Sequence, residues 1–262
     1  RMVGNVELLS LTDGHGKGRP TEIFPSSSED IWHREYSEFI DEDGFINPRF
    51  GSLMVRSSGK LVVVDTGAGP PDGTLLSEMD HEGVDRNSVN LVVMTHLHPD
   101  HVGWNLSGPV PNFPNAKYLV PEADWEYWNQ PNIIENNEHI VDQVVPLEQL
   151  DLMELIGGEY QITPELIAVS TPGHTPGHIS IAISSAGQKG FILGDVAHSP
   201  VQANHTDWSP SFDIDGDLAA KTRHAILDRL ESEKSLVSAG HFPGLGFGHF
   251  IRRDGRRYWQ GC

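Results

Sequence analysis

The sequence predicts a single α/β domain in which strands and helices alternate and a functional site lies along one edge of the sheets. Short runs of apolar, β-branched residues are interspersed with segments of helical periodicity along the chain. Most His-rich and Asp-rich segments directly follow one of these runs, so their polar side chains are expected at strand ends. No low-complexity linker or internal repeat divides the 262 residues. We therefore expect one domain over residues 1–262.

The first third of the chain is predicted to contain three strands and a short helix. Val6–Leu11 alternates weakly between apolar and polar residues, which is typical of an opening strand. Ser52–Arg56 and Lys60–Val64 flank a short Ser-Ser-Gly turn and predict a hairpin. Thr74–Glu82 is the candidate for the helix.

Residues 20–50 lack a sustained period and form a long excursion rich in aromatic rings. Long loops inside compact domains are usually functional, so this segment is expected to cover a site. A separate hydrophobic cluster explains the rings equally well, and a homodimer contact is a third role. The rings belong to Phe24, Trp32, Tyr36, Phe39, Phe45 and Phe50.

The remainder of the chain alternates further strands with two helices. The helices are predicted over Glu122–Trp128 and Asp217–Glu231, and the second has the clearest amphipathic pattern. The strands are predicted over Leu91–Thr95, Lys117–Val120, Leu166–Ser170, Ile179–Ile183, Gly190–Leu193 and, as the last strand, Leu236–Ala239.

Large apolar rings are concentrated after the Leu91–Thr95 strand. Such rings commonly line concave ligand sites around a few polar groups. Core packing explains some of them equally well, and we expect one or two to face a substrate. They are the rings of Trp104, Phe113, Trp125, Tyr127 and Trp128.

Four potential metal ligands lie within six positions at the end of the Leu91–Thr95 strand. Alternate side chains of an extended segment share a face, so His96 and His98 can reach one metal ion together. The tight Pro-Asp step that follows turns Asp100 and His101 towards a second ion. Packing alone explains such a cluster poorly, because each imidazole buried without a partner costs free energy.

Residues 96–101 resemble the H-x-H-x-D-H signature of the metallo-β-lactamase superfamily. Members of this family also carry an Asp at a strand-to-turn junction before the signature, a later His after a Gly, a Gly-Asp pair after a strand and a last His near the C-terminus. The matching positions are Asp65, Gly173-His174, Gly194-Asp195 and Gly240-His241. The resemblance covers nearly the whole chain, and it implies an αββα sandwich of two mixed β-sheets flanked by helices.

The resemblance also implies how seven ligands divide between two metal ions. The first ion is assigned to His96, His98 and His174, and the second to Asp100, His101 and His241, with Asp195 between them. Zinc is the expected metal, while manganese, iron or cobalt suits the same His and carboxylate donors. No cysteine is placed to act as a ligand, because the single cysteine, Cys262, is the last residue. The cysteine-ligated β-lactamases of the family are therefore a poor match.

Several other polar residues are weaker candidates for a role at the metal site. Asp65 is implied to orient a ligand histidine, although an Asp at such a junction also serves local hydrogen bonding. The family implies that His178 lies outside the ligand set. His249 competes with His241, which we prefer because it directly follows a strand. The histidines expected to be solvated or satisfied in the core include His15, His33, His81, His139, His205 and His224.

This ligand set implies hydrolysis by an activated water molecule. Two divalent ions lower the pKa of a shared water, so that a hydroxide is available to attack an ester near neutral pH. Asp100, a ligand that also faces the water, is a catalytic candidate because it can carry a proton to the leaving oxygen.

Three segments of the chain look most like the acyl-homoserine lactonase and methyl parathion hydrolase branch of the family. They are the motif running to Asn105, the Gly-Asp-Val-Ala-His run and the C-terminal Gly-His-Phe-Pro-Gly segment. The lactonases usually have a substrate-contacting Tyr three positions after the bridging Asp, whereas this chain has His198, as in the organophosphate-hydrolysing relatives. A His can donate a hydrogen bond to an oxyanion as a phenol does, so His198 is a second catalytic candidate. The alternative for His198 is a packed neighbour of the ligands.

The leading hypothesis is a dinuclear hydrolase of a small neutral ester, most of all a lactone of the kind that quorum-quenching enzymes open. An organophosphate triesterase is the first alternative, because it uses the same nucleophile. A glyoxalase II thioesterase is less favoured, since no additional basic helical domain follows. A single-iron sulfur dioxygenase would use the same early ligands. A non-catalytic binding module predicts missing ligands, and none of the seven is missing.

Composition narrows the partners further. The formal net charge of −19 argues against a nucleic-acid partner, because such binding depends on clustered Lys and Arg. No apolar run approaches the roughly 18 residues that span a bilayer, so no membrane partner is expected. Nothing before Val6 resembles a signal peptide, and a cytoplasmic location is expected, although a start at Arg-Met leaves a removed leader open.

Overall fold

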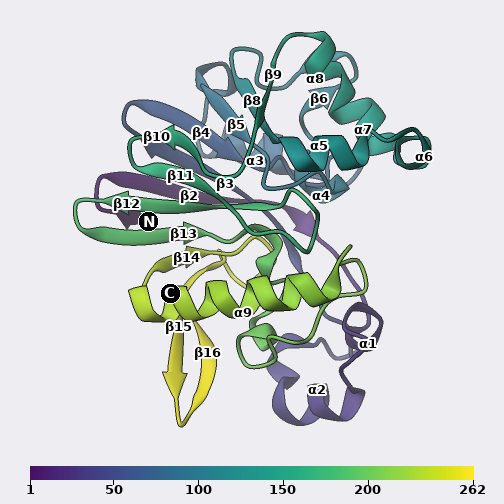
Figure 1. Cartoon of the computed structure of the whole chain (residues 1–262), viewed down its shortest axis with the longest axis vertical. Helices are drawn as coiled ribbons and strands as arrows, with labels where there is room; N and C mark the ends of the chain where they lie inside the picture. Colours follow the sequence, from purple (N-terminus) through teal and green to yellow (C-terminus); the bar gives the residue numbers. More distant parts are fainter.

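Two seven-stranded β-sheets packed face to face form the centre of the molecule, in a computed structural model that describes residues 1–262. Helices lie on the outer face of each sheet, which gives four layers (Figure 1). The predicted αββα sandwich is therefore confirmed.

The first sheet is mixed and contains the strands of the N-terminal half. Its first four strands are antiparallel to one another, and its last four are parallel. In spatial order it consists of β1 (Met2–Val3), β2 (Val6–His15), β3 (Arg49–Ser57), β4 (Lys60–Val64), β5 (Leu91–Val93), β8 (Lys117–Pro121) and β9 (Met153–Ile156).

The second sheet follows chain order from one edge to the other. Its neighbours are antiparallel except for β13 and β14, which run parallel because a long helix connects them. The strands are β10 (Tyr160–Thr163), β11 (Leu166–Ser170), β12 (Ile179–Ser185), β13 (Gln188–Ile192), β14 (Leu236–Ser238), β15 (Phe247–Arg253) and β16 (Arg256–Gly261). A separate small hairpin pairs β6 (Leu106–Ser107) with β7 (Val110–Pro111).

Strand β4 shows why the inner strands read as continuous apolar runs. Leu61 and Val63 face the helices that cover the first sheet, whereas Val62 and Val64 face the second sheet. Both faces of the strand are buried, so apolar residues are required at every position rather than at alternate ones. The motif strand β5 is buried in the same way, with Val92 on one face and Val93 on the other.

Helices of the first half cover the first sheet, and one long helix covers the second. The first set comprises α3 (Leu75–His81), α4 (Pro99–Val102), α5 (Glu122–Trp128), α6 (Pro131–Ile134), α7 (Glu138–Gln143) and α8 (Val145–Gln149). The long helix is α9 (Gly216–Glu233), which begins where the Asp215 side chain accepts a hydrogen bond from Leu218 N at 2.9 Å. No helix has both the length and the apolar character needed to span a membrane.

Two sequence predictions are corrected by the fold. Residues 20–50 are not structureless, because they contain α1 (Pro20–Ile23), α2 (Glu29–Glu35) and a 3₁₀ turn. Leu236–Ala239 is not the last strand, because β15 and β16 add a C-terminal hairpin. That hairpin lies at the sheet edge with several Arg residues facing outward, so its period of two is masked by charge.

We predict that Leu227→Ala lowers the free energy of unfolding by about 2–5 kcal/mol, because it leaves a cavity between α9 and the second sheet. Leu227 is fully buried against Phe191 and Val237. Leu218→Ala on the same helix is the control, since Leu218 is 37% exposed and its loss should cost under about 1 kcal/mol. Urea unfolding followed by circular dichroism measures both, and equal losses would contradict the assigned packing of α9.

Candidate metal centre

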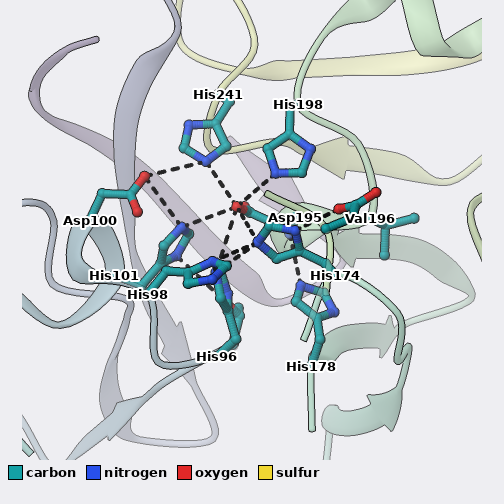
Figure 2. Close-up of polar contacts among 12 residues, drawn as sticks. His96, His98, Asp100, His101, His174, His178, Asp195, Val196, His198 and His241 are labelled. Carbon is teal, nitrogen blue, oxygen red and sulfur yellow. Dashed lines mark hydrogen bonds and ion pairs between the residues drawn. The ribbon is translucent and has the colours of Figure 1, made fainter. Parts of the chain in front are cut away.

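The structure brings all seven predicted ligands together at one edge of the sandwich (Figure 2). Each lies in the segment that follows a strand of one of the two sheets, so the ends of four strands converge there. His96 and His98 follow β5, Asp100 and His101 belong to α4, His174 lies between β11 and β12, Asp195 follows β13, and His241 follows β14.

Three imidazole nitrogens form a closed triangle at the first predicted metal position. His96 Nε2 lies 3.1 Å from His98 Nδ1 and 3.2 Å from His174 Nε2, and the last two atoms are 2.8 Å apart. Three atoms in a triangle cannot all form donor–acceptor pairs with one another. Ligands about 2.0–2.1 Å from one tetrahedral ion lie about 3.3 Å apart, so the triangle has nearly the spacing that a bound cation requires.

Asp195 lies between the two predicted metal positions. Its Oδ2 is 3.3 Å from His174 Nε2 on one side, and 3.3 Å from His101 Nε2 and 3.1 Å from His241 Nε2 on the other. Asp100 Oδ2 lies 3.7 Å from the same nitrogens of His101 and His241. This second group has the His and carboxylate composition of a divalent-ion site.

Hydrogen bonds behind the imidazoles direct their lone pairs into the site. His101 Nδ1 donates to Asp65 Oδ2, His174 Nδ1 to Asp213 Oδ1, and His241 Nδ1 to the carbonyl of Arg49, each at 2.8 Å. In the neutral form of each ring the outer nitrogen carries the one proton, so the inner Nε2 presents a lone pair.

Asp65 supports the motif in the way that the sequence analysis implied. Its Oδ2 accepts hydrogen bonds from His101 and from the hydroxyl of Thr95, and its Oδ1 accepts one from Thr95 N at 2.7 Å. Since the Thr95 hydroxyl donates to Asp65, its oxygen accepts the Nδ1 proton of His96 at 3.0 Å. Asp65 has a φ of 58°, an uncommon backbone conformation that places its carboxylate beneath the motif.

The electrostatics of the cluster require positive charge. Burial opposes ionisation of Asp195, but the surrounding imidazoles, His241 and His101 foremost, hold its pKa well below the usual range. Burial likewise opposes protonation of His174, yet Asp195 and Asp213 raise its pKa to about 9. By contrast, burial and the nearby charge of His174 lower the pKa of His98 to about 3. Divalent cations would supply the charge that these carboxylates demand.

Two buried atoms further support the fit to metal ions. His101 Nε2 and Asp195 Oδ1 have no hydrogen-bond partner in the interior, where an unpaired polar atom is costly. Both atoms belong to residues of the predicted ligand set. The residues present therefore fit a pair of divalent ions.

His178 supports the site from outside the ligand set. Its Nε2 accepts a hydrogen bond from Asp195 N at 2.8 Å, and its Nδ1 donates to the carbonyl of Thr171 at 3.0 Å. The approach is close, because a Cβ on Gly194 would lie 2.6 Å from His178 Nε2, and Gly194 has a φ of 56°. His249 lies away from the ligands on β15, where its Nδ1 donates to the carbonyl of Ser235.

His198 lies inside the cluster. Its Nε2 is 3.0 Å from Asp195 Oδ2, and its ring is stacked on that of His241 with centroids 5.4 Å apart. Burial, as the largest effect, lowers the pKa of His198 to about 4, so the imidazole is neutral near pH 7. This position is open to both a substrate-contacting role and a ligand-like role.

A cavity of about 490 Å³ opens onto the cluster. His98, Asp100, Asp195, His198 and His241 form one wall. The other wall is largely apolar and consists of Gly16, Lys17, Ile23, Phe24, Ile46, Pro48, Phe50, Ala68, Pro99 and Phe212.

The aromatic segment 20–50 contributes both to the cover of a site and to a separate hydrophobic cluster, two of the roles expected for it. Phe24 and Phe50 line the cavity, as a cover would. Phe24 and Trp32 also pack with Trp208 in a separate hydrophobic cluster. Phe212 lines the cavity too, with its ring edge-on to His198 at a centroid distance of 5.0 Å. Sequence reasoning missed Phe212, which has no periodic pattern around it.

The expectation that one or two rings from Trp104 to Trp128 face a substrate is wrong. None of these rings lines the cavity. Trp125 and Trp128 are three positions apart on α5, so they share the face that the helix buries against the first sheet. Phe113 is fully buried in the same cluster, and Trp104 donates its indole proton to Asp13 at 2.7 Å.

The family model of the metallo-beta-lactamase superfamily matches residues 52–241 of this chain. The chain belongs to the metallo-β-lactamase superfamily, as the resemblance at the motif indicated.

Among curated proteins, the chain is similar to the N-acyl homoserine lactonase AiiA of Bacillus thuringiensis subsp. kurstaki, with 25% identity over 180 residues. The matched region covers 65% of this chain and 66% of AiiA, just under two thirds of that relative. The N-acyl homoserine lactonase AttM of Agrobacterium fabrum is 29% identical over 120 residues, 42% of each chain.

Among solved structures, the hydrolase AbOPH of the beta-lactamase superfamily superposes with a TM-score of 0.90 and 26% identity, covering 100% of this chain and 96% of its own. The lactonase AidC, described as a dizinc quorum-quenching enzyme in complex with a product, superposes with a TM-score of 0.87. The superposition covers 100% of this chain and 96% of AidC. At 23% identity, it shows a likeness in fold.

We predict that His241→Gln reduces the bound metal from two equivalents to about one, because it removes an inner lone pair from the second group. His249→Gln is the matched control and should retain both equivalents, since His249 bonds only to a backbone carbonyl away from the site. Metal content after desalting, measured by inductively coupled plasma mass spectrometry, distinguishes them. Loss of metal in the His249 variant alone would reverse the assignment.

Proposed function

We propose that the protein is a metal-dependent hydrolase of small neutral esters, with lactones as the first substrate class. One observation carries this proposal: the donor atoms of the cluster form one wall of a largely apolar cavity of about 490 Å³. Outside the cluster, Lys17 is the one ionisable side chain in the lining, and it pairs with Asp41 at 3.5 Å. Such a lining favours an uncharged substrate with an apolar group.

The chain's own residues are arranged for ester hydrolysis. Two divalent ions bound at this site would lower the pKa of a water molecule and polarise the scissile carbonyl. Asp100 has a side chain that is 24% exposed and lines the cavity, so its carboxylate can pass a proton to the leaving alkoxide oxygen. Phe24, Phe50 and Phe212 offer the apolar surface that would hold the acyl group and exclude bulk water.

His198 is proposed to contact the carbonyl oxygen of the substrate. It lines the cavity beside Asp195, and its imidazole is neutral near pH 7, so one ring nitrogen carries a proton. Nδ1 is buried without a partner and Nε2 lies 3.0 Å from Asp195 Oδ2, so the proton offered to a substrate oxygen is the one on Nε2. A hydrogen bond to an oxygen that gains charge in the transition state accelerates acyl transfer. The similarity to N-acyl homoserine lactonases supports a lactone as the ester.

A phosphotriester is the second candidate substrate class. It is favoured by His198, which occupies the position where acyl-homoserine lactonases usually have Tyr. A neutral triester also suits the largely apolar cavity lining.

We predict that the metal-loaded protein hydrolyses γ- or δ-lactones, that exhaustive chelation abolishes the activity, and that added Zn²⁺ or Mn²⁺ restores it. The reason is that the proposed mechanism uses no protein nucleophile and depends on an activated water. A pH-stat assay on lactones of increasing chain length, beside a paraoxon-like triester and a thioester, measures the preference. Full activity after chelation would remove the mechanism, and a preference for the triester would reverse the order of the two candidates.

We predict that His198→Phe lowers kcat by about 10²–10³-fold, the usual effect of losing one oxyanion donor, while two metal equivalents remain bound. His198→Tyr supplies a phenol donor from the same position and should recover much of the lactone turnover. Steady-state kinetics and metal analysis of both variants make the test. If His198→Phe loses a metal equivalent, His198 is a ligand instead of a substrate contact.

A further inference from the structure

Arg223 on α9 is a buried cation that no part of the proposed reaction uses. Its side chain is 0% exposed. The guanidinium donates from Nε to the carbonyl of Val196 at 2.7 Å, and from one terminal nitrogen to the carbonyls of Thr206 and Trp208 at 2.9 and 3.1 Å. The other terminal nitrogen donates to Asp213 Oδ2 at 3.2 Å. Burying a charge is costly unless it is paired and hydrogen-bonded in this way.

Asp213 connects this guanidinium to the metal cluster. Its side chain is 1% exposed, and its Oδ1 accepts the Nδ1 proton of His174 at 2.8 Å. The two carboxylate oxygens therefore bond in opposite directions, one to a candidate ligand and the other to Arg223. The backbone continues the attachment, because Ile214 N donates to the carbonyl of His174 and Asp215 N donates to the carbonyl of Gly173.

Arg223 also holds the loop that carries Asp195. Val196, whose carbonyl accepts from Arg223 Nε, is the residue directly after Asp195. A single guanidinium thus fixes the backbone beside one candidate ligand and the carboxylate behind another. The two ligands meet with His174 Nε2 3.3 Å from Asp195 Oδ2 (Figure 2).

We propose that Asp213 and Arg223 are a positioning pair that holds His174 and Asp195 at the separation a metal pair requires. The inference rests on the proposed metal function of the site and assigns roles to two residues outside its ligand set. The Asp213 carboxylate fixes the tautomer and orientation of His174, and it makes Nε2 of His174 a stronger metal ligand. Arg223 prevents the carboxylate from rotating away and ties both loops to α9.

Close packing of α9 on the His174 loop supports a rigid arrangement. A Cβ on Gly173 would lie 2.3 Å from Ala219 N in the first turns of α9, and Gly173 has a φ of 130°. The loop therefore rests directly on the helix backbone. With Arg223 one turn further along α9, the helix serves as the common base for both ligand loops.

Asp213→Asn is the decisive variant, because it keeps the shape of the side chain and removes its charge. We expect the affinity for one Zn²⁺ equivalent to fall about 10–100-fold, the usual effect of losing a group that orients a metal-bound His. Competition between the protein and a chromophoric chelator measures this without any substrate. Asp217→Asn is the matched control, since Asp217 is exposed and lies four residues away, at the start of α9.

Long-range ¹⁵N–¹H spectra of the imidazoles in the zinc-loaded protein provide a readout that general destabilisation would not move. We expect the signal of the His174 Nδ1 proton to shift or exchange rapidly in Asp213→Asn and to stay unchanged in Asp217→Asn. Arg223→Lys should lower zinc affinity too, and its effect should be less than additive with Asp213→Asn, because the two residues act through one contact.

Unchanged zinc affinity and an unchanged His174 signal in Asp213→Asn would refute the positioning role of Asp213 and Arg223, even if the variant melts at a lower temperature. The outcome is separate from the fate of the proposed function. A protein that binds two metal ions but hydrolyses no ester would refute ester hydrolysis, while loss of zinc affinity in Asp213→Asn would still support the positioning pair.

Discussion

The buried carboxylate of Asp195 is the constraint on which the rest of the structure depends. It lies where the ends of two sheets meet, and the Nε2 atoms of His96, His101, His174, His198 and His241 approach its Oδ2 within 3.6 Å. An anion among so many imidazoles is stable only when positive charge shares the site. The chemistry proposed for the protein follows from the same requirement, because cations that would balance Asp195 would also activate water.

The imidazoles can form this cluster because groups behind them define their orientation. Asp65 bonds to His101 and, through Thr95, fixes the proton of His96. The Arg49 carbonyl accepts the Nδ1 proton of His241, and the Asp213 carboxylate accepts that of His174. These supports come from distant parts of the chain, so the metal site and the packing of the two sheets are a single structural unit. Damage to a support would alter ligand geometry before it unfolded the protein.

The cavity explains how one cluster can be directed to a particular substrate. Its metal-facing wall is polar, whereas Phe24, Phe50 and Phe212 come from segments outside the motif. Substitutions in these segments would therefore alter the apolar surface of the cavity and leave the donor atoms of the cluster in place. The segment 20–50 contributes both a wall of the cavity and a hydrophobic cluster with Trp208, which anchors that wall to the second half of the chain.

Prediction from the sequence was strongest where a local signal existed. The candidate ligands lie beside strand ends and match a family motif, and the structure brings them together. The inner strands could be predicted because both of their faces are buried. The C-terminal hairpin was missed since its Arg residues obscure the alternation. One or two of the rings from Trp104 to Trp128 were expected to face a substrate, because sequence does not show which way a helix or loop faces.

The sequence by itself determined the fold family, the candidate ligands and the class of chemistry to be tested, because short motifs encode donor type and spacing directly. Only the tertiary structure decided which side chains stand behind the ligands and which line the cavity. Asp213 and Arg223 are ten residues apart in unremarkable segments, and their role depends on where α9 meets the His174 loop. Contacts of that kind arise from packing between distant segments, for which a single sequence carries no local pattern.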